Sequence, residues 1–162
     1  MKTLVVYGST TGTAEDIANR IAQQAGGADV VSAADLTAAD LTDHDLLILG
    51  SSTWGAGDLQ DDWFDALSIL TSAPLAGKRV AIFGVGDAES YPDTFCGSMK
   101  ALYDAATQAG ATVVGAVPTD GYSFDDSEAV VDGKFVGLAL DEVNESDKTD
   151  GRIASWIAAI GA

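Results

Sequence analysis

Short runs of apolar residues alternate with longer amphipathic segments along most of the chain. The apolar runs have the length and composition of strands that are covered on both faces, whereas the amphipathic segments repeat apolar residues three or four positions apart, as on one side of a helix. A strand followed by a helix, repeated, indicates right-handed crossovers and a parallel sheet with helices on both faces. We therefore expect one α/β domain over residues 1–162. Strands are predicted at 3–7, 46–49, 80–83 and 112–114, and helices at 15–25, 61–70, 96–109 and 153–160.

Several side chains receive structural assignments from their spacing. Trp63, Phe64 and Trp156 lie at helical spacing among apolar neighbours, which predicts that all three face the core. His44 lies in a polar turn before a predicted strand, so we expect it at the surface. Cys96 is expected at the start of a helix, as a small packing residue rather than a nucleophile.

Residues 116–149 interrupt the alternation of strands and helices. This segment contains several glycines and acidic residues and only short apolar pieces, and a minimal α/β unit does not need it. We interpret it as an insertion near the last strand. It could serve as a loop that docks a partner or supports a cofactor, or as a folded excursion that covers an edge of the sheet, and we favour the second interpretation.

The amino-acid composition excludes several classes of function and partner. Eight Lys and Arg against 25 Asp and Glu leave 162 residues with a net charge of −17. Such a chain repels phosphate backbones and anionic lipids, so we expect no binding to nucleic acid or membranes and favour basic proteins as partners. One cysteine and one histidine argue against disulfides, zinc clusters and most triad chemistry. No signal-peptide segment or membrane-length apolar run is present, which predicts a cytoplasmic protein.

Ligands of open parallel sheets bind at the carboxyl ends of the strands, so the turns after the predicted strands are candidate sites. The first turn, residues 8–15, reads GSTTGTAE and opens a helix. Backbone N–H groups at a helix N-terminus, together with several hydroxyls, can hold a phosphate dianion without a cationic side chain. The alternative is an ordinary helix cap made by Ser9 or Thr11. Because four hydroxyls in five residues exceed the needs of a cap, we favour phosphate binding.

Aromatic residues occupy two further turns. Trp54 lies in a glycine-rich loop after the strand at 46–49, and Tyr91 lies in the loop after the strand at 80–83. An aromatic side chain in such a loop is costly to expose unless a flat ligand stacks on it. Two aromatics beside a phosphate loop therefore suggest a planar aromatic phosphate ester held between two rings.

These motifs together resemble the flavodoxins, specifically the long-chain type. Ser9, Thr11 and Gly12 match the phosphate-loop pattern of that family, and residues 53–60, TWGAGDLQ, with Asp62 and Trp63, are similar to its first flavin loop. Residues 86–95 and 133–153 resemble the second flavin loop and the C-terminal part. The resemblance covers essentially the whole chain, and segment 116–149 falls where long-chain members carry their insertion.

The resemblance implies a flavodoxin-like three-layer sandwich with a five-stranded parallel sheet in the order 2-1-3-4-5. It implies a low-potential one-electron carrier, not an enzyme, that binds FMN non-covalently and works through a neutral semiquinone and the hydroquinone. Trp54 and Tyr91 would cover the two faces of the isoalloxazine. The cofactor-binding residues expected on this basis are Ser9, Thr10, Thr11, Gly12, Thr13 and Ala14 in the first loop, Ser52, Thr53, Trp54, Gly55, Ala56 and Gly57 in the second, and Gly86, Asp87, Tyr91, Phe95 and Cys96 in the third.

Two positions of this pattern carry specific expectations. Ala14 stands where the family motif ends in threonine, so one hydroxyl is missing. Losing a hydrogen bond to a charged group costs about 1.5–3 kcal/mol, which predicts weaker FMN binding. Gly55 has no Cβ, so the peptide that follows it can rotate at little steric cost and turn its carbonyl toward the N5–H of the one-electron-reduced flavin.

Acidic residues surround the predicted flavin loops. Residues 51–70 and 84–99 contain no Lys or Arg, and they contain seven acids: Asp58, Asp61, Asp62, Asp65, Asp87, Glu89 and Asp93. These carboxylates disfavour an anionic reduced flavin and attract basic redox partners, such as a donor of the ferredoxin/flavodoxin–NADP reductase type and a low-potential acceptor. The same charge predicts a monomer, because copies of the chain repel one another.

Three alternatives use related folds. An FMN-dependent NAD(P)H quinone reductase needs cationic groups for its nicotinamide cofactor, and the two flavin loops offer none. A receiver domain needs an aspartate after the third strand and a lysine after the fifth, where this chain has Gly50-Ser51 and Gly115-Ala116. An FMN-storage protein without redox function differs only in having no reason to separate the two reduction steps.

Overall fold

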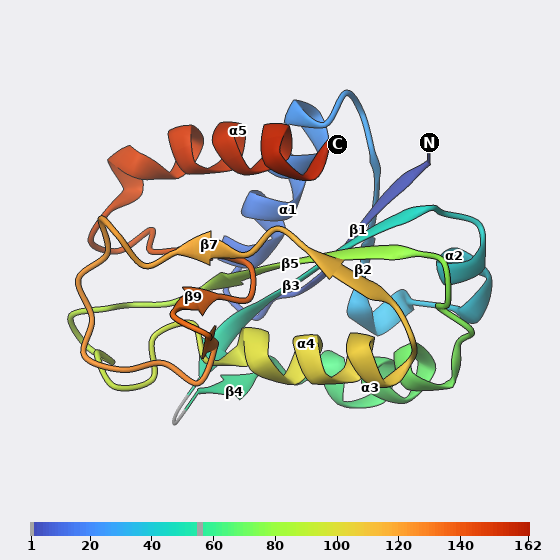
Figure 1. Cartoon of the computed structure of the whole chain (residues 1–162), viewed down its shortest axis with the longest axis horizontal. Helices are drawn as coiled ribbons and strands as arrows, with labels where there is room; N and C mark the ends of the chain where they lie inside the picture. Colours follow the sequence, from blue (N-terminus) through green and yellow to red (C-terminus); the bar gives the residue numbers. More distant parts are fainter. Residues whose placement is uncertain (1, 55–56) are drawn as a thin grey trace.

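The computed structural model describes residues 2–54 and 57–162. Its centre is a parallel sheet in which the strands follow the order β10-β5-β3-β1-β2 (Figure 1). Four positions of the sheet are each filled by a single strand. These strands are β2 (Asp29–Ser32), β1 (Thr3–Gly8), β3 (Leu46–Trp54) and β5 (Arg79–Val85). Chain order and sheet order therefore agree with the predicted arrangement 2-1-3-4-5.

The fifth position of the sheet is filled by two short strands. β6 (Thr112–Val114) pairs with the first half of β5, and β10 (Leu138–Leu140) pairs with its second half, both in parallel. The chain leaves the sheet after β6 and returns to it in β10. The insertion expected at 116–149 therefore contains part of the central sheet, and the excursion itself is confined to residues 115–137. With β4 (Asp58–Leu59), antiparallel to β3, this sheet has seven strands in the described part of the chain instead of five.

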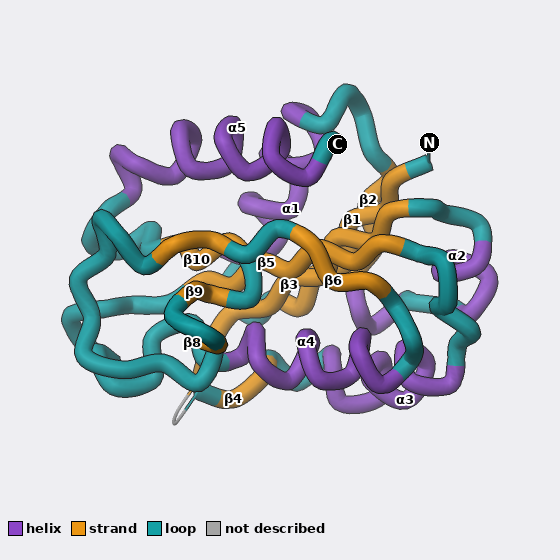
Figure 2. The backbone as a smooth tube through the Cα atoms, in the orientation of Figure 1, coloured by secondary structure: helices purple, strands orange, loops and turns teal. Residues whose placement is uncertain are grey.

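Helices cover both faces of the sheet. α1 (Thr13–Gln24) and α5 (Thr149–Ile160) lie on one face, and α3 (Trp63–Ser72) and α4 (Ser98–Gln108) lie on the other (Figures 1 and 2). Two short elements contribute residues to the core under α3 and α4: the helix α2 (Ala38–Thr42) and the 3-10 turn η1 (Ala33–Asp35). A second 3-10 turn, η2 (Ser146–Lys148), leads into α5. This is the expected three-layer sandwich, and none of its described helices is long and apolar enough to cross a membrane.

The sheet has one hydrophobic core on each face, and successive side chains of a strand belong alternately to one core and to the other. Leu4 and Val6 of β1 pack under α3 and α4, whereas Val5 between them packs under α1 and α5. Leu47 and Ile48 of β3 divide in the same way. Because successive side chains of a strand point to opposite faces, a strand covered on both faces must be apolar at every position, which is why these strands were evident as continuous apolar runs.

The excursion between β6 and β10 folds into its own small sheet. Strands β7 (Val117–Pro118), β9 (Lys134–Phe135) and β8 (Val130–Val131) pair antiparallel in that order. Rings of Tyr122, Phe124 and Phe135 surround the ring of Phe95, at centroid distances between 5.7 and 6.2 Å. The amides of residues 125 and 126 also donate to the carbonyl of Pro92 at 2.8 and 2.9 Å. The excursion is thus attached to the loop that follows β5.

Three of the single-residue assignments were right and two were wrong. Trp63, Trp156 and Cys96 are buried in the core, as expected. Phe64 is 60% exposed, because its neighbour Trp63 takes the inward position of the helix. His44 is buried, with Nδ1 2.6 Å from the Asp40 carbonyl and Nε2 2.8 Å from an Asp29 carboxylate oxygen.

Candidate functional site

Three loops meet at one end of the sheet, where β1, β3 and β5 finish. Gly8 lies opposite Ser51, and Ser51 lies opposite Gly84, so the three strands end side by side. The loops are residues 9–12, the turn between β3 and β4, and residues 86–97. Sheet order reverses between β1 and β3, because the chain goes from β1 to β2 on one side and to β3 on the other. A crevice at such a reversal is the usual ligand site of this architecture.

The first loop ends at a helix that has no side-chain cap. Gly12 is the N-cap residue of α1, with φ of 92°, a left-handed conformation that suits glycine. Its amide donates to Ser9 Oγ at 3.0 Å, so Ser9, one of the two cap residues of the alternative interpretation, closes the loop rather than capping the helix. The first amides of any helix have no acceptor within it. In α1 the first such amides belong to Thr13 and Ala14. They follow the exposed residues Thr10 and Thr11.

A second contact fixes the start of α1. The hydroxyl of Tyr7, at the end of β1, donates to a carboxylate oxygen of Glu15 at 2.6 Å. Because Glu15 accepts this proton in a hydrogen bond, the pKa of Tyr7 rises to about 12. Ala14 next to it is fully buried in the core under α1 and α5, so it contributes only its main chain to the loop.

Gln60 joins the first loop to the second and was not among the predicted site residues. It is 4% exposed, and its Nε2 donates to Thr10 Oγ1 at 2.9 Å. Its main-chain amide donates to Ser51 Oγ at 3.0 Å, and its Oε1 accepts from the amide of Asp62 at 2.9 Å. Nearly every polar atom of this glutamine is therefore used to hold the two loops together. The sequence signal that could have found it is its place at the end of the loop motif 53–60.

The second loop follows β3, whose last residues pair with β4. Thr53 pairs with Leu59 and Trp54 with Asp58, which makes the end of β3 an antiparallel hairpin with β4. Thr53 Oγ1 lies 2.8 Å from Ser98 Oγ, which ties this hairpin to α4. Gly55, Ala56 and the side chain of Trp54 lie outside the described residues, so the roles predicted for them stay predictions.

The third loop is organised around the carboxylate of Asp87. Its Oδ1 accepts from the amides of Glu89 and Ser90 and from Nδ2 of Asn144, at 3.2, 3.0 and 2.8 Å. The pKa of Asp87 is lowered chiefly by the hydrogen bond from the Ser90 amide and then by that from Asn144. The amide of Tyr91 donates to the Asp87 carbonyl, and the Tyr91 side chain is 53% exposed. Tyr91 thus stands at the surface on a loop held from within.

Asp141 and Asn144 support the third loop from the segment after β10, and sequence reasoning did not find them. Asp141 is fully buried. One carboxylate oxygen accepts from the amide of Ala88 and from Asn144 Nδ2, at 3.1 and 2.8 Å, and the other accepts from the amides of Val143 and Asn144. A buried carboxylate needs such donors, and here they bind two distant segments together.

Phe95 and Cys96 lie beneath the third loop rather than on it. Phe95 is 1% exposed, within the aromatic cluster of the excursion, and its carbonyl accepts from Ser127 Oγ. Cys96 is fully buried with φ of 51°, and burial raises the pKa of its thiol. The side chains of both residues are therefore packed under the loop, and their predicted place among the cofactor-binding residues stays a prediction. Gly86 is held from the same side, since its amide donates to the Leu140 carbonyl at 2.9 Å.

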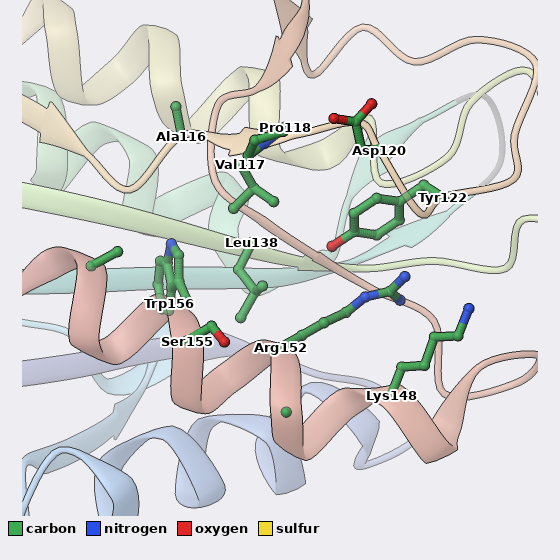
Figure 3. Close-up of a pocket in the computed structure, with 12 residues that line it drawn as sticks. Ala116, Val117, Pro118, Asp120, Tyr122, Leu138, Lys148, Arg152, Ser155 and Trp156 are labelled. Atoms are coloured by element: carbon green, nitrogen blue, oxygen red, sulfur yellow. The ribbon is translucent and has the colours of Figure 1, made fainter.

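A groove of considerable size lies elsewhere on the molecule. A space of about 760 Å³ separates α5 from the β7 region, with Val117, Leu138 and Trp156 among the residues that line it (Figure 3). The guanidinium of Arg152 stacks on Tyr122 there, 3.9 Å from the ring centre, and pairs with Glu145 at 3.1 Å. None of the residues lining this groove belongs to the three loops. The groove therefore adds nothing to the candidate site.

The donors at the start of α1 fit a phosphate group. The uncapped N-terminus of α1 and the hydroxyls beside it offer neutral donors to an anion, as in other phosphate sites at helix N-termini. Within the described residues, no group of His, Cys, Asp and Glu side chains is arranged to hold a metal ion. The fold defines a doubly wound α/β protein whose strand order reverses between β1 and β3.

The comparisons with known proteins assign the family. The flavodoxin family model matches residues 5–156. The flavodoxin of Nostoc sp. strain PCC 7120 is 46% identical over 157 residues, covering 95% of this chain and 92% of the relative. Flavodoxin 1 of Azotobacter vinelandii is 40% identical over 162 residues, covering 96% and 93%. This chain belongs to the flavodoxin family.

Solved structures agree with that assignment. A mutant of Fusobacterium nucleatum flavodoxin bound to flavin mononucleotide superimposes with a TM-score of 0.91 at 32% identity, covering 99% of this chain and 96% of the other. Flavodoxins are electron-transfer proteins, so family membership favours a carrier that exchanges electrons with redox proteins over the reductase alternative.

Proposed function

We propose that this flavodoxin binds one FMN non-covalently and carries single electrons between redox proteins. The observation that carries the proposal is the start of α1, where the amides after Gly12 are uncapped and the hydroxyls of Thr10, Thr11 and Thr13 lie beside them. FMN supplies the redox chemistry when bound. The chain supplies a neutral donor set for its phosphate, which needs no lysine or arginine.

The ring system would lie between the second and third loops. Tyr91, exposed on a loop that Asp87 and Asn144 hold in place, is suited to cover one face. Trp54 is proposed for the other face, and main-chain groups of Ser52, Thr53 and Gly86 for the polar edge. We retain the hypothesis that the Gly55 carbonyl accepts a hydrogen bond from a protonated N5, because a glycine peptide can rotate at low steric cost.

The acidic residues around these loops would influence both the reduction potential of the carrier and its choice of partner proteins. A cluster of carboxylates disfavours additional negative charge on a bound flavin, which lowers the potential of the second electron. The same carboxylates attract basic redox proteins, for which a reductase of the ferredoxin–NADP type is the proposed donor and a low-potential protein the proposed acceptor. The net charge of −17 makes copies of the chain repel one another, so we propose that the carrier is monomeric. We also propose that it acts in the cytoplasm.

Anaerobic, stepwise reduction of the FMN-loaded protein, followed by visible absorption, tests the proposal. We expect a blue, one-electron-reduced form to accumulate to most of the flavin before the second step. Conversion of the oxidised form directly to the fully reduced form would contradict one-electron transfer and would favour the quinone reductase, which an NAD(P)H-dependent assay detects. A protein that takes up no FMN would contradict the phosphate site itself.

A further inference from the structure

The groove between α5 and the β7 region has an apolar body and a cationic end (Figure 3). Its space of about 760 Å³ lies in the range of small-molecule sites, which are mainly apolar and carry a few polar groups. Val117, Leu138 and Trp156 contribute apolar side chains, whereas Lys148 and Arg152 lie together at the end where α5 begins. The groove thus has the two-part lining of a site for an amphipathic small molecule.

Small side chains on α5 keep the groove open. Gly151, Ser155 and Ala159 follow one another about one helical turn apart, so they share one side of the helix, and all three line the groove. A Cβ built on Gly151 would meet no neighbouring group within 4 Å. Ala116 is equally small on the opposite wall. A large side chain at any of these positions would occupy part of the space, which therefore follows from the sequence.

The cationic end of the groove is held in place by several contacts. The Arg152 guanidinium lies 3.9 Å from the centre of the Tyr122 ring and donates to Glu145 and to the Gly121 carbonyl, both at 3.1 Å. Lys148 Nζ donates to the other Glu145 oxygen at 2.7 Å. Two cations thus share one carboxylate, and both cations have more N–H donors than these contacts use. The end of the groove is therefore rigid and still able to donate hydrogen bonds.

We propose that this groove binds a small carboxylate that carries an apolar body. The body would lie along Val117 and Leu138, and the carboxylate would accept hydrogen bonds from Lys148 and Arg152, whose planar guanidinium matches the two carboxylate oxygens. Asp120, the acid of the lining, is directed away from both cations (Figure 3). None of the lining residues belongs to the three loops, so this inference goes beyond the proposed carrier function and does not rest on it.

Charge selects this ligand over others. A cationic ligand would meet Lys148 and Arg152 with the same sign of charge, and a neutral apolar ligand would not use their remaining donors. The net charge of −17 repels anions at long range, but salt at about 0.15 M screens charges beyond about 8 Å and leaves direct contacts. A nucleic acid, with many phosphates, is repelled more strongly than a monoanion. A small monoanion with an apolar body is therefore favoured.

A pair of probe ligands tests the proposal. Naphthylacetate is titrated into the nitrogen-15-labelled, FMN-loaded protein at about 0.15 M salt, and amide shifts are followed by NMR. Naphthylacetamide has the same ring and nearly the same shape without the charge. We expect the shifts to concentrate at residues 116–122, 138 and 148–159. The Kd of the amide should be about threefold higher than that of the carboxylate, as for an exposed ion pair.

Two neighbouring substitutions on α5 test the location. Ala159→Leu places a larger side chain in the groove, whereas Ala158→Leu adds the same side chain at the adjacent exposed position, which does not line the groove. We expect Ala159→Leu to raise the Kd of naphthylacetate about tenfold or more, because the apolar body then competes with the new side chain. Ala158→Leu should leave the Kd unchanged.

A second pair of variants tests the charge. Lys148→Gln should raise the Kd of naphthylacetate about threefold and leave that of naphthylacetamide unchanged, since only the carboxylate uses the ammonium. Lys134→Gln removes the same charge from β9, outside the groove, and should have the smaller effect.

The outcomes separate this site from the carrier function. An absence of shifts, shifts centred on the three loops, equal Kd values for the two ligands, or equal effects of the two members of either variant pair would overturn the proposed site. FMN uptake and stepwise reduction of the same samples report on the carrier proposal alone, and we expect Ala159→Leu to change neither.

Discussion

Asn144 donates a hydrogen bond of 2.8 Å to Asp87, 57 positions earlier in the sequence. The same nitrogen donates at 2.8 Å to Asp141, so one amide group lies between two carboxylates. Asp87 holds the turn that presents Tyr91, and Asp141 is buried behind it. Without the amide, the two carboxylates would face each other with one donor fewer. Asn144 is therefore a positioning residue for the third loop.

Asn144→Asp replaces that donor with a third carboxylate. We expect the free energy of unfolding of the apoprotein to fall by about 1–3 kcal/mol, since a donor to buried or half-buried charge is lost. FMN should bind roughly tenfold more weakly, because the loop under Tyr91 is then less well ordered. Urea unfolding and titration of FMN fluorescence measure the two effects.

Asn19→Asp is the matched control for this substitution. Asn19 is exposed on α1, so the change adds the same charge without disturbing the Asp87–Asn144–Asp141 contacts. It should alter stability by no more than about 0.5 kcal/mol. If the two variants bound FMN equally well, Asn144 would have no role in positioning the loop.

The two threonines of the first loop should separate phosphate binding from loop structure. Thr11 is exposed, and Thr11→Val removes its hydroxyl with little change of shape. We expect FMN affinity to fall about tenfold or more, as for a lost hydrogen bond to a charged group, with the apoprotein as stable as before. Equilibrium titration with FMN and thermal unfolding of the apoprotein make the measurement.

Thr10→Val is the companion variant. Thr10 Oγ1 accepts from the buried Gln60, so this change removes the partner of Gln60 Nε2 and should destabilise the apoprotein by about 1–3 kcal/mol. If Thr11→Val left the FMN affinity unchanged, the phosphate would not be bound by that hydroxyl.

The predicted fold was correct where local pattern decides structure. β1, β3 and β5 are buried on both faces, so their sequences are continuous apolar runs. β2 lies at the edge of the sheet, and no residue of it is buried, so it carries no such run and was not predicted. β10 is buried at all three positions, but a run of three apolar residues is too short to be distinguished from the insertion around it, so it was absorbed into the predicted insertion.

The site was predictable only in part, because much of it depends on contacts between distant segments. The first loop was recognised from its hydroxyls and its place before a helix. Gln60, Asp141 and Asn144 were missed, since a buried polar residue has the same local sequence as an exposed one until its partner is known. His44 was placed at the surface because its partner Asp29 lies on a different element.

Gly8 should tolerate no side chain. A Cβ at this position would lie 2.6 Å from Trp63 Cδ1 and 2.7 Å from Gln60 Oε1, both buried. Gly8→Ala should therefore lower the unfolding free energy by about 1–3 kcal/mol, the usual cost of overpacking, and loosen the junction of the first two loops. Gly151→Ala is the control: its Cβ meets nothing within 4 Å in α5, and alanine favours helix by about 1 kcal/mol, so stability should rise. Urea unfolding of the two apoproteins should show shifts of opposite sign.

Glu145 should make stability depend on pH below the neutral range. Lys148 and Arg152 lie 2.7 and 3.1 Å from its two carboxylate oxygens, and the hydrogen bond from Lys148 is the main cause of its lowered pKa. Because the pKa is lower in the folded state, this carboxylate stabilises the fold above its ordinary pKa of 4.5, and the contribution is lost as pH falls through the folded value.

Glu145→Gln should accordingly cost about 1 kcal/mol of unfolding free energy at pH 7, a modest value because water screens part of the ion pair. The difference from the unmodified protein should shrink as the pH is lowered below 4.5 and vanish once the carboxyl is protonated in both states. Urea unfolding of the two apoproteins between neutral and acidic pH provides the curve, with Glu89→Gln, an exposed glutamate, as the control. A difference that stayed constant with pH would mean that Glu145 acts through packing around Arg152 and Tyr122 rather than through its charge.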